Sequence, residues 1–315
     1  MSPMTGNGTL ISTMTSVSLR HAGNAMSEQM DTIVRYHDVS RTMELERCVF
    51  SIVGQSYRPL NIILTTQRFS EDEIEATRSV LAPMIDSDDE VMLTILNWDQ
   101  AEPADARSEL LNLGLRGATG RYLAFLDYDD VLYPEAYELL VSQLKESRAA
   151  IAFAAVRIMQ LDVYDQYLYT TEEIIPGYRG TGLIDLFRNN FCPLHSYAID
   201  REQMSGDPLF FETTMTMQED YDWLLRLCAQ YQSDFTLINT RIGDYYYKTD
   251  GSNTVPTTGG LKGEAQARLD AVITTMEVRR RTTVVSKEVQ RSFGISDPND
   301  MATVREVVDR VAKGG

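Results

Sequence analysis

The sequence has few cysteines and little positive charge. Its 315 residues include 3 cysteines, far apart, without the paired spacing that zinc sites or disulfide frameworks need. Its 29 Lys and Arg residues are outnumbered by 46 Asp and Glu, which gives a net charge of −17. A nucleic-acid-binding protein needs a basic surface that releases counterions from the phosphate backbone. The charge balance therefore argues against nucleic acid as a partner.

Long apolar runs are also absent. No run approaches the ~20 residues of a membrane-spanning helix, and the N-terminus lacks the basic flank and apolar core of a secretory signal. Three unpaired cysteines favour a reducing compartment. We therefore expect a cytoplasmic protein without a transmembrane segment. Residues 1–29 are rich in Ser, Thr, Met and Gly without an apolar period, which predicts a disordered leader.

Strand and helix patterns alternate through the next hundred residues. Short apolar runs predict strands at 32–36, 61–65, 91–96 and 120–126. Between them, apolar spacing predicts helices at 45–53, 71–83 and 105–117, and a fourth helix follows Pro134. Four strand–helix units in succession predict a parallel sheet with helices on both faces. In such sheets, ligands bind outside the carboxyl ends of the strands.

The order loosens after residue 150. Strands are predicted at Ile151–Met159, Val163–Tyr169, 196–199 and 235–247, which suggests a mixed or antiparallel part. Helices are expected at 183–189 and 218–231, and two or three polar helices follow within 260–283 and 300–312.

The fourth predicted strand ends in three carboxylates within four positions: Asp127, Asp129 and Asp130. Hard divalent cations take oxygen ligands, and Mg²⁺ is held by one or two carboxylates plus substrate phosphates. The strand end therefore predicts a cation site for a phosphorylated ligand. The alternative is a solvated turn that caps the following helix. For Asp130, capping or support fits as well as ligation.

Three segments of the chain resemble motifs of family 2 glycosyltransferases. Residues 112–130 closely resemble the family signature, roughly N-x-G-[IL]-x-x-A-x-G-x-[YF]-[IL]-x-F-L-D-x-D-D. Residues 46–57 look like the family's first helix with its Gln-[Ser/Thr]-[Tyr/Phe] ending, and residues 218–227 are similar to its later Glu-Asp motif. The resemblance covers about residues 31–255, with the motifs in the family's order.

The resemblance implies an α/β fold of the GT-A type. This is a Rossmann-like, mostly parallel sheet with helices on both faces, a mixed acceptor-side half and a helical C-terminal tail. It divides the chain into a domain at 30–255, with a nucleotide-sugar-binding half (30–130) and an acceptor-binding half (131–255), and an extension at 256–315. The C-terminal helices are candidates for partner binding, for covering the core or for homo-oligomerisation.

The implied activity is inverting transfer of a sugar from a UDP-, GDP- or TDP-linked donor to a hydroxyl group. The acceptor is a glycan, a lipid-linked or a small molecule. By resemblance, Asp127 contacts the ribose or the metal, and Asp129 holds Mn²⁺ or Mg²⁺ on the diphosphate. The expected donor-binding residues are Arg35, Tyr36, Gln67, Arg107, Asp127, Asp129 and Lys248.

The closing loop departs from the family pattern, commonly Tyr-Arg-x-His-Gly-Ser. Lys248 stands for the Arg and still offers a cation to the diphosphate, whereas Asp250 stands for the His and cannot do so. Positions 35–38 replace a frequent Pro-Thr-Tyr-Asn, and Thr65-Thr66-Gln67 replaces an acidic pair. Arg35, Tyr36 and Gln67 are therefore assigned to base contacts by position alone.

Inversion needs a base that takes the proton of the acceptor hydroxyl. By resemblance Asp220 is this base, and Glu219 supports the acceptor or the base. For Glu219 an alternative is open, because residues 216–219 have the spacing of a helix capping box. His195 is interpreted as a hydrogen-bonded structural residue. The run Tyr245-Tyr246-Tyr247 is able to stack on sugars, but packing within a strand explains it equally well.

Two other functions compete with this interpretation. Residues 125–132 also resemble the nucleophile loop of haloacid-dehalogenase-like phosphatases, although that loop normally follows the first strand and has Gly at position 130. The second alternative is a non-catalytic nucleotide-sugar-binding relative. Release of phosphate from simple phosphomonoesters would support the phosphatase. Donor binding without turnover would support the non-catalytic relative.

Overall fold

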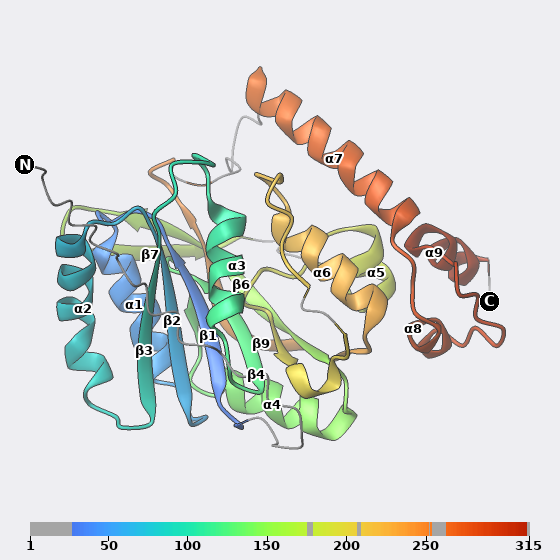
Figure 1. The fold of residues 1–315 in the computed structure, drawn as a ribbon, viewed down its shortest axis with the longest axis horizontal. Helices are drawn as coiled ribbons and strands as arrows, with labels where there is room; N and C mark the ends of the chain where they lie inside the picture. Colours follow the sequence, from blue (N-terminus) through green and yellow to red (C-terminus); the bar gives the residue numbers. More distant parts are fainter. Residues whose placement is uncertain (1–26, 175–178, 207–208, 252, 254–262, 314–315) are drawn as a thin grey trace, which may run out of the picture.

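The computed structural model describes residues 27–174, 179–206, 209–251, 253 and 263–313. One sheet of nine strands runs through these residues in the order β3-β2-β1-β4-β8-β6-β9-β5, and β7 pairs with β6 (Figure 1). The strands are β1 (Met30–Tyr36), β2 (Leu60–Gln67), β3 (Val91–Trp98), β4 (Tyr122–Asp127), β5 (Val131–Leu132), β6 (Ile151–Val163), β7 (Leu168–Glu173), β8 (Tyr197–Asp200) and β9 (Ser233–Lys248). The helices are α1 (Thr42–Val53), α2 (Glu71–Ile85), α3 (Arg107–Gly117), α4 (Ala136–Ser147), α5 (Leu183–Arg188), α6 (Glu219–Gln230), α7 (Glu264–Thr282), α8 (Lys287–Ser292) and α9 (Val304–Ala312).

The N-terminal half of the sheet is parallel, as the alternating strand and helix patterns predict. Strand β1 lies between β2 and β4, and β3 continues the sheet beyond β2. Successive residues of a strand point to opposite faces. Thus Ile33 packs into the core that contains α3 and α6, whereas Val34 packs into the core that contains α1, α2 and α4. Helices therefore cover both faces of this half.

The second half of the sheet is mixed. Strand β8 runs antiparallel to β4 and β6, while β9 runs parallel to β6. The prediction of a strand at Val163–Tyr169 is wrong in its bounds, because β6 continues to Val163 and β7 begins at Leu168. The turn lies between them and is closed by a hydrogen bond from the Tyr164 N–H to the Tyr167 carbonyl (3.0 Å). The sequence gives no signal for this turn, because the segment contains neither Gly nor Pro and its aromatic residues are typical of strands.

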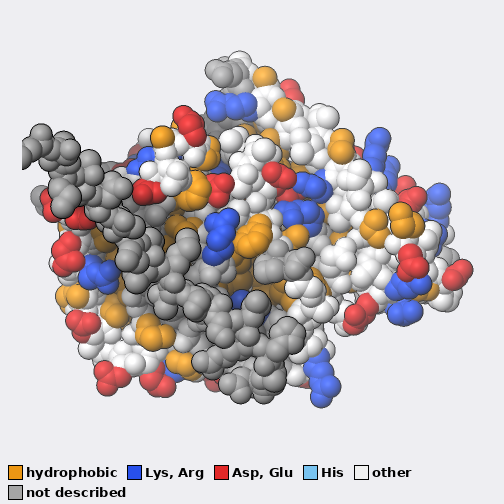
Figure 2. Space-filling model, in the orientation of Figure 1, with side chains coloured by type: hydrophobic (Ala, Val, Ile, Leu, Met, Phe, Trp, Pro, Cys, Tyr) orange, Lys and Arg blue, Asp and Glu red, His pale blue; other side chains and the backbone are white. Residues whose placement is uncertain are grey.

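The C-terminal helices pack against the body of the molecule. Met276 of α7, Val289 of α8 and Val304 and Val307 of α9 are buried in the same core as Leu224 of α6. Helix α7 extends from these contacts toward the top of the view in Figure 1. No helix within the described ranges is long and apolar enough to span a bilayer. On the face shown in Figure 2, acidic and basic side chains are interspersed, without a patch of one sign.

Two residues of the 112–130 segment hold loops around β4. Asn112 is buried and exchanges two hydrogen bonds with the backbone of Phe211, which fixes the chain ahead of α6 (2.8 and 3.0 Å). Gly120 lies where a Cβ atom would come within 2.5 Å of the Gln29 carbonyl oxygen. Its N–H donates to the buried carboxylate of Asp31 (2.7 Å). These contacts explain why this segment needs an amide and a glycine at these positions.

Candidate functional site

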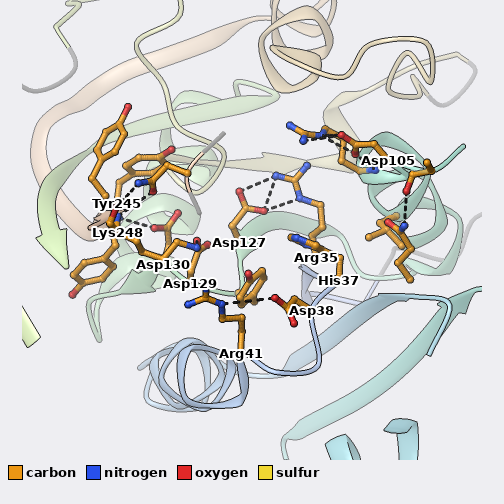
Figure 3. A pocket seen from close by; sticks show the side chains of 18 residues that line it. Arg35, His37, Asp38, Arg41, Asp105, Asp127, Asp129, Asp130, Tyr245 and Lys248 are labelled. Atoms are coloured by element: carbon orange, nitrogen blue, oxygen red, sulfur yellow. Dashed lines mark hydrogen bonds and ion pairs between the residues drawn. The ribbon is translucent and has the colours of Figure 1, made fainter. Parts of the chain in front are cut away.

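A cleft of about 640 Å³ opens at the carboxyl ends of β1, β2 and β4 (Figure 3). It is closed on one side by the end of β9. The structure therefore places a cavity where a parallel sheet binds ligands. The lining residues are Arg35, His37, Asp38, Arg41, Gln67, Ala104, Asp105, Arg107, Leu110, Asp127, Tyr128, Asp129, Asp130, Tyr245, Tyr246, Tyr247, Lys248 and Asn253.

Asp127 is bound by Arg35 on the neighbouring strand. The parallel register pairs these two residues directly, so their side chains share one face of the sheet. The Arg35 guanidinium donates from Nε and Nη2 to the two carboxylate oxygens of Asp127, both at 2.9 Å. Burial alone raises the pKa of Asp127, but the charge and hydrogen bonds of Arg35 outweigh it and lower the pKa below its ordinary value.

The third nitrogen of Arg35 reaches a different element. Nη1 donates to Oε1 of Glu219, the first residue of α6, at 2.8 Å. Both side chains are largely buried, with 16% of Arg35 and 6% of Glu219 exposed. One guanidinium thus joins the end of β4 to the start of α6, although the two carboxylates are 92 residues apart in the chain.

Asp129 is paired with Lys248. The Nζ atom lies 2.7 Å from Oδ2 of Asp129, and only 4% of the lysine side chain is exposed. Lys248 also lies over the ring of Tyr128, 5.6 Å from its centroid. The Asp129 carbonyl accepts a hydrogen bond from Arg47 of α1 (2.8 Å). The structure therefore brings the predicted closing-loop cation onto the predicted metal carboxylate.

Asp130 is turned away into the protein. Its Oδ1 accepts a hydrogen bond from the Tyr246 N–H (2.8 Å), and Oδ2 lies 3.4 Å from Nδ1 of His195. Burial and the neighbouring carboxylates Asp129 and Asp127 raise the pKa of Asp130 well above its ordinary value. Burial lowers the pKa of His195 to about 4, so this ring is neutral at neutral pH. Asp130 is placed for support rather than for ligation.

Glu219 and Asp220 lie together at the start of α6. The capping-box alternative for Glu219 is wrong, because the helix begins at Glu219 itself and Gln218 is the N-cap, in a left-handed conformation (φ 55°) without a side-chain hydrogen bond. Asp220 is half-buried, and its Oδ1 accepts from the Tyr221 N–H (2.8 Å). Burial and the charge of Glu219 raise the pKa of Asp220 to about 7. A carboxylate with this pKa suits a general base near neutral pH.

The remaining predicted donor residues divide into two groups. Gln67 and Arg107 line the cleft, where Gln67 donates to the Ala104 carbonyl (2.8 Å) and Arg107 pairs with Asp105 (2.8 Å). The structure places Tyr36 elsewhere. Its ring is buried, and its hydroxyl donates to the Val39 carbonyl (3.1 Å).

Sequence reasoning missed Arg41 and His37, which also line the cleft. Arg41 precedes α1 and pairs with Asp250 of the closing loop (2.7 Å), so this ion pair joins the start of α1 to the loop after β9. No motif contains Arg41. The one signal was its partner, since an Asp at a position where the family commonly has a cation calls for a cation nearby.

The cleft offers two carboxylates of the strand end, Asp127 and Asp129, to a divalent cation. Within the described ranges, no group of three or more His, Cys, Asp and Glu side chains converges as a metal site. Asp127 and Asp129 nonetheless match the one or two carboxylates that suffice when substrate phosphates complete the coordination. Asp127 and Asp129 therefore fit a divalent cation whose remaining ligands come from a diphosphate.

Comparison with known proteins identifies the family. The family model described as glycosyl transferase family 2 matches residues 41–204. An uncharacterized glycosyltransferase of Haemophilus influenzae is 25% identical over 160 residues, 51% of this chain and 58% of that protein. The GalNAc(5)-diNAcBac-PP-undecaprenol beta-1,3-glucosyltransferase of Campylobacter jejuni is 30% identical over 112 residues, 36% of this chain and 34% of its own length. Aligned segments thus span about a third to somewhat over half of these relatives.

Solved structures show a similar fold. S. aureus TarS 1–349 in complex with UDP-GlcNAc superposes with a TM-score of 0.56 at 12% identity, over 85% of this chain and 73% of that one. Mannosyltransferase PcManGT from Pyrobaculum calidifontis, in complex with GDP-Man and Mn²⁺, gives 0.50 at 13% identity, over 92% and 76%. These likenesses confirm the predicted fold class.

The family assignment rests on the length of the match. The matched region includes the cleft carboxylates Asp127 and Asp129, whereas Glu219, Asp220 and Lys248 lie beyond it. The family match argues against the phosphatase alternative. The Asp127 loop also follows the fourth strand, whereas the phosphatase loop follows the first. Because the model covers more than half of the 315 residues, the chain belongs to glycosyl transferase family 2.

Proposed function

We propose that the protein transfers a sugar from a nucleotide-diphosphate donor to an acceptor hydroxyl, with inversion and with a divalent cation. The observation that carries this proposal is the Arg35 bridge, which holds the cleft carboxylate Asp127 and the α6 residue Glu219 on one guanidinium. The bridge ties Asp127, assigned to the donor, to the start of α6, where Asp220 follows Glu219. Asp220 is half-buried, and its pKa of about 7 suits proton transfer.

Proton transfer in this mechanism is the task of Asp220. The acceptor oxygen attacks the anomeric carbon of the donor as its proton passes to the Asp220 carboxylate. The bond between the anomeric carbon and the diphosphate oxygen breaks on the opposite side, which inverts the configuration. Glu219 accepts a hydrogen bond from Arg35, which holds the start of α6 in place.

Charge develops on the leaving diphosphate, and the chain offers cations for it. Lys248 and Arg41 line the cleft and pair with Asp129 and Asp250, respectively. A divalent cation, when bound with the diphosphate, supplies Lewis-acid stabilisation of the leaving group. The Mn²⁺ in the PcManGT complex supports this part of the proposal.

The parallel and mixed halves of the sheet are assigned to different substrates. We assign the donor to the parallel half within 30–130 and the acceptor to the mixed half within 131–255, with 256–315 as an extension. UDP-GlcNAc and GDP-Man, bound in the similar structures, support UDP- and GDP-linked sugars as first candidates for the donor. TDP-linked sugars belong in the same screen. The acceptor class is a glycan, a lipid-linked or a small molecule.

A thermal-shift screen of UDP-, GDP- and TDP-sugars, with and without Mn²⁺, tests the proposal. A ligand at a hundred times its Kd stabilises the folded protein by about 2.7 kcal/mol. We expect one nucleotide class to raise Tm, more so with Mn²⁺, and the same donor to be hydrolysed slowly or transferred. Binding without any turnover would support the non-catalytic alternative, and no stabilisation by any nucleotide sugar would refute donor binding.

A further inference from the structure

The tyrosine run 245–247 is divided by the alternation of β9. Tyr246 is buried, with Arg47 stacked 4.2 Å from its ring centroid. Tyr245 and Tyr247 point to the opposite face of the sheet and are only partly buried, with their rings edge to face at 5.5 Å. Both line the cleft. Tyr246 also lines the cleft but is buried by strand packing, whereas Tyr245, which stacks on His195, and Tyr247 each keep part of the ring exposed.

The register continues this aromatic face across two further strands. Tyr247 pairs with Gln160 of β6, and Asp162, two residues on, lies on the same face as Gln160. Asp162 pairs with Tyr169 of β7. Tyr169 therefore shares the face of Tyr245 and Tyr247, and we name these three residues the tyrosine face. Neighbouring strands lie about 4.8 Å apart, so the face extends roughly 10 Å outward from β9.

The outer part of this surface is exposed. Tyr169 is 58% exposed, and Tyr164 and Tyr167 at the adjoining turn are 45% and 57% exposed and stack on each other at 4.5 Å. Exposed aromatic side chains gathered in one place, continuous with a cleft, mark a binding surface. Polar groups accompany them, since the Thr249 hydroxyl donates to Oδ1 of Asp162 on the same face (2.8 Å).

The chemistry of the surface selects its ligand. An aromatic ring has a negative face, which attracts the positively polarised C–H groups on the flat side of a sugar ring, while carboxylates accept hydrogen bonds from sugar hydroxyls. The segment 158–171, which carries Tyr169 and the adjoining turn, contains two acids, Asp162 and Asp165, and no Lys or Arg. This charge opposes anionic polymers and anionic membrane surfaces. A neutral saccharide is the ligand that matches both the rings and the charge.

We propose that the tyrosine face binds a neutral saccharide chain that carries the acceptor hydroxyl. Its reacting end enters the cleft at Tyr245 and Tyr247, and its further sugar units run over β6 to Tyr169. The acceptor is then an oligosaccharide instead of a single sugar or a bare lipid. This inference rests on the proposed function and adds the acceptor class to it.

Saturation-transfer NMR with neutral oligosaccharides tests the proposal. The probes are the malto-, manno- and chito-oligosaccharide series from one to six units, added to the full chain with UDP or GDP present. We expect at least one series to bind with an affinity that rises with chain length. Tyr169→Ala should remove the gain with length, weakening the longer members about three- to tenfold, the range of one aromatic contact.

Matched variants separate the possible causes. Tyr169→Phe keeps the ring and should bind like the wild type, while the exposed position leaves the fold of either variant intact. UDP or GDP affinity, measured in the same samples, should be unchanged by Tyr169→Ala, so a failure of donor binding is seen separately. Binding by no series, equal binding by Tyr169→Ala, or a Tyr169-dependent dimer of the chain in light scattering would each overturn the proposal.

Discussion

Two carboxylate pairs, one lining the cleft and one at the start of α6, look alike in sequence but are held differently. In the first pair, Asp127 and Asp129 each have a cation, Arg35 and Lys248, within hydrogen-bond distance. In the second pair, Glu219 shares the same Arg35, and Asp220 accepts a hydrogen bond from the backbone N–H of Tyr221. A cation lowers the pKa of Asp127, whereas burial and a neighbouring charge raise that of Asp220.

The difference teaches how one arginine separates two chemical tasks. Carboxylates that must stay charged for a cation or a ribose are paired with positive charge, which favours the charged form. A carboxylate that must take up a proton is buried beside another negative charge, which favours the protonated form. Pairs of acids whose surroundings push their pKa values apart commonly divide such roles.

The sharpest way to break the comparison is Asp220→Asn. If Asp220 is the base, transfer should fall by about 10²–10⁴-fold, the usual contribution of a positioned base. UDP or GDP affinity should stay within about twofold, since Asp220 is absent from the residues that line the donor cleft. Steady-state rates and calorimetric titration measure both. The control is Asp105→Asn, which removes a carboxylate that does line the cleft, and an active Asp220→Asn protein would refute the assignment.

Lys248→Met tests the donor side of the comparison. The loss of a charged hydrogen-bonding partner costs about 1.5–3 kcal/mol. Without metal, the Kd for UDP or GDP should therefore rise about 10- to 100-fold, and Mn²⁺ should restore part of the affinity by neutralising Asp129. Lys248→Arg, which keeps the cation, is the matched control. Equal losses with Mn²⁺ and in EDTA would show that Lys248 and the cation do not share Asp129.

Arg35→Gln tests whether the two pairs are coupled. Arg35 lowers the pKa of Asp220 against burial and the Glu219 charge, so its loss should raise that pKa above about 7. The base is active when deprotonated, so the acid limb of the pH profile of kcat/KM should move to higher pH by about one unit. Arg35→Lys should show a smaller shift. A lower rate with an unmoved profile would reduce Arg35 to a structural role.

The comparison also predicts a stability effect with a definite sign. The pKa of Asp220 is raised from 3.8 to about 7, so between these values the folded protein holds more protons than the unfolded chain. The wild type should therefore lose stability as pH rises through this window. Asp220→Asn lacks this titration, so its Tm should exceed that of the wild type by an amount that grows from pH 4 to pH 7. A constant difference in calorimetry would contradict the raised pKa.

The smallest expected effect marks the boundary of the donor site. Tyr36→Phe removes only the hydroxyl that donates to the Val39 carbonyl, at a cost of about 1 kcal/mol in stability. The affinity for UDP or GDP should change less than about twofold, because the ring is buried away from the cleft. A larger loss, measured by calorimetric titration, would return Tyr36 to the donor-binding residues.

Much of the fold could be predicted because local periodicity encodes it. The parallel strands β1 to β4 and the strand end at Asp127 and Asp129 follow from short patterns. Alternation along β1 also rules out one of the two assignments made for Arg35 and Tyr36. Arg35 and Tyr36 are adjacent on one strand and must point to opposite faces, so only one of them was able to face the cleft.

Short sequence patterns do not predict the ion pairs of the site. Arg35 and Glu219 are 184 residues apart, and Lys248 and Asp129 are 119 apart. These contacts depend on how α6 and β9 pack beside the parallel half. A single sequence shows neither the partner nor the distance, although it did show that Lys248 and Glu219 belonged to motifs.

Arg35 couples ligand binding at Asp127 to the electrostatic environment of Glu219 and Asp220. A ligand or cation that competes for Asp127 changes how much of the guanidinium charge remains for Glu219 and, beside it, for Asp220. Any such coupling is reciprocal, so a ligand bound beside Asp220 alters the affinity at Asp127 by the same factor. The shared counterion thus provides a physical basis for coupling between the two ends of the site, whichever ligand binds first.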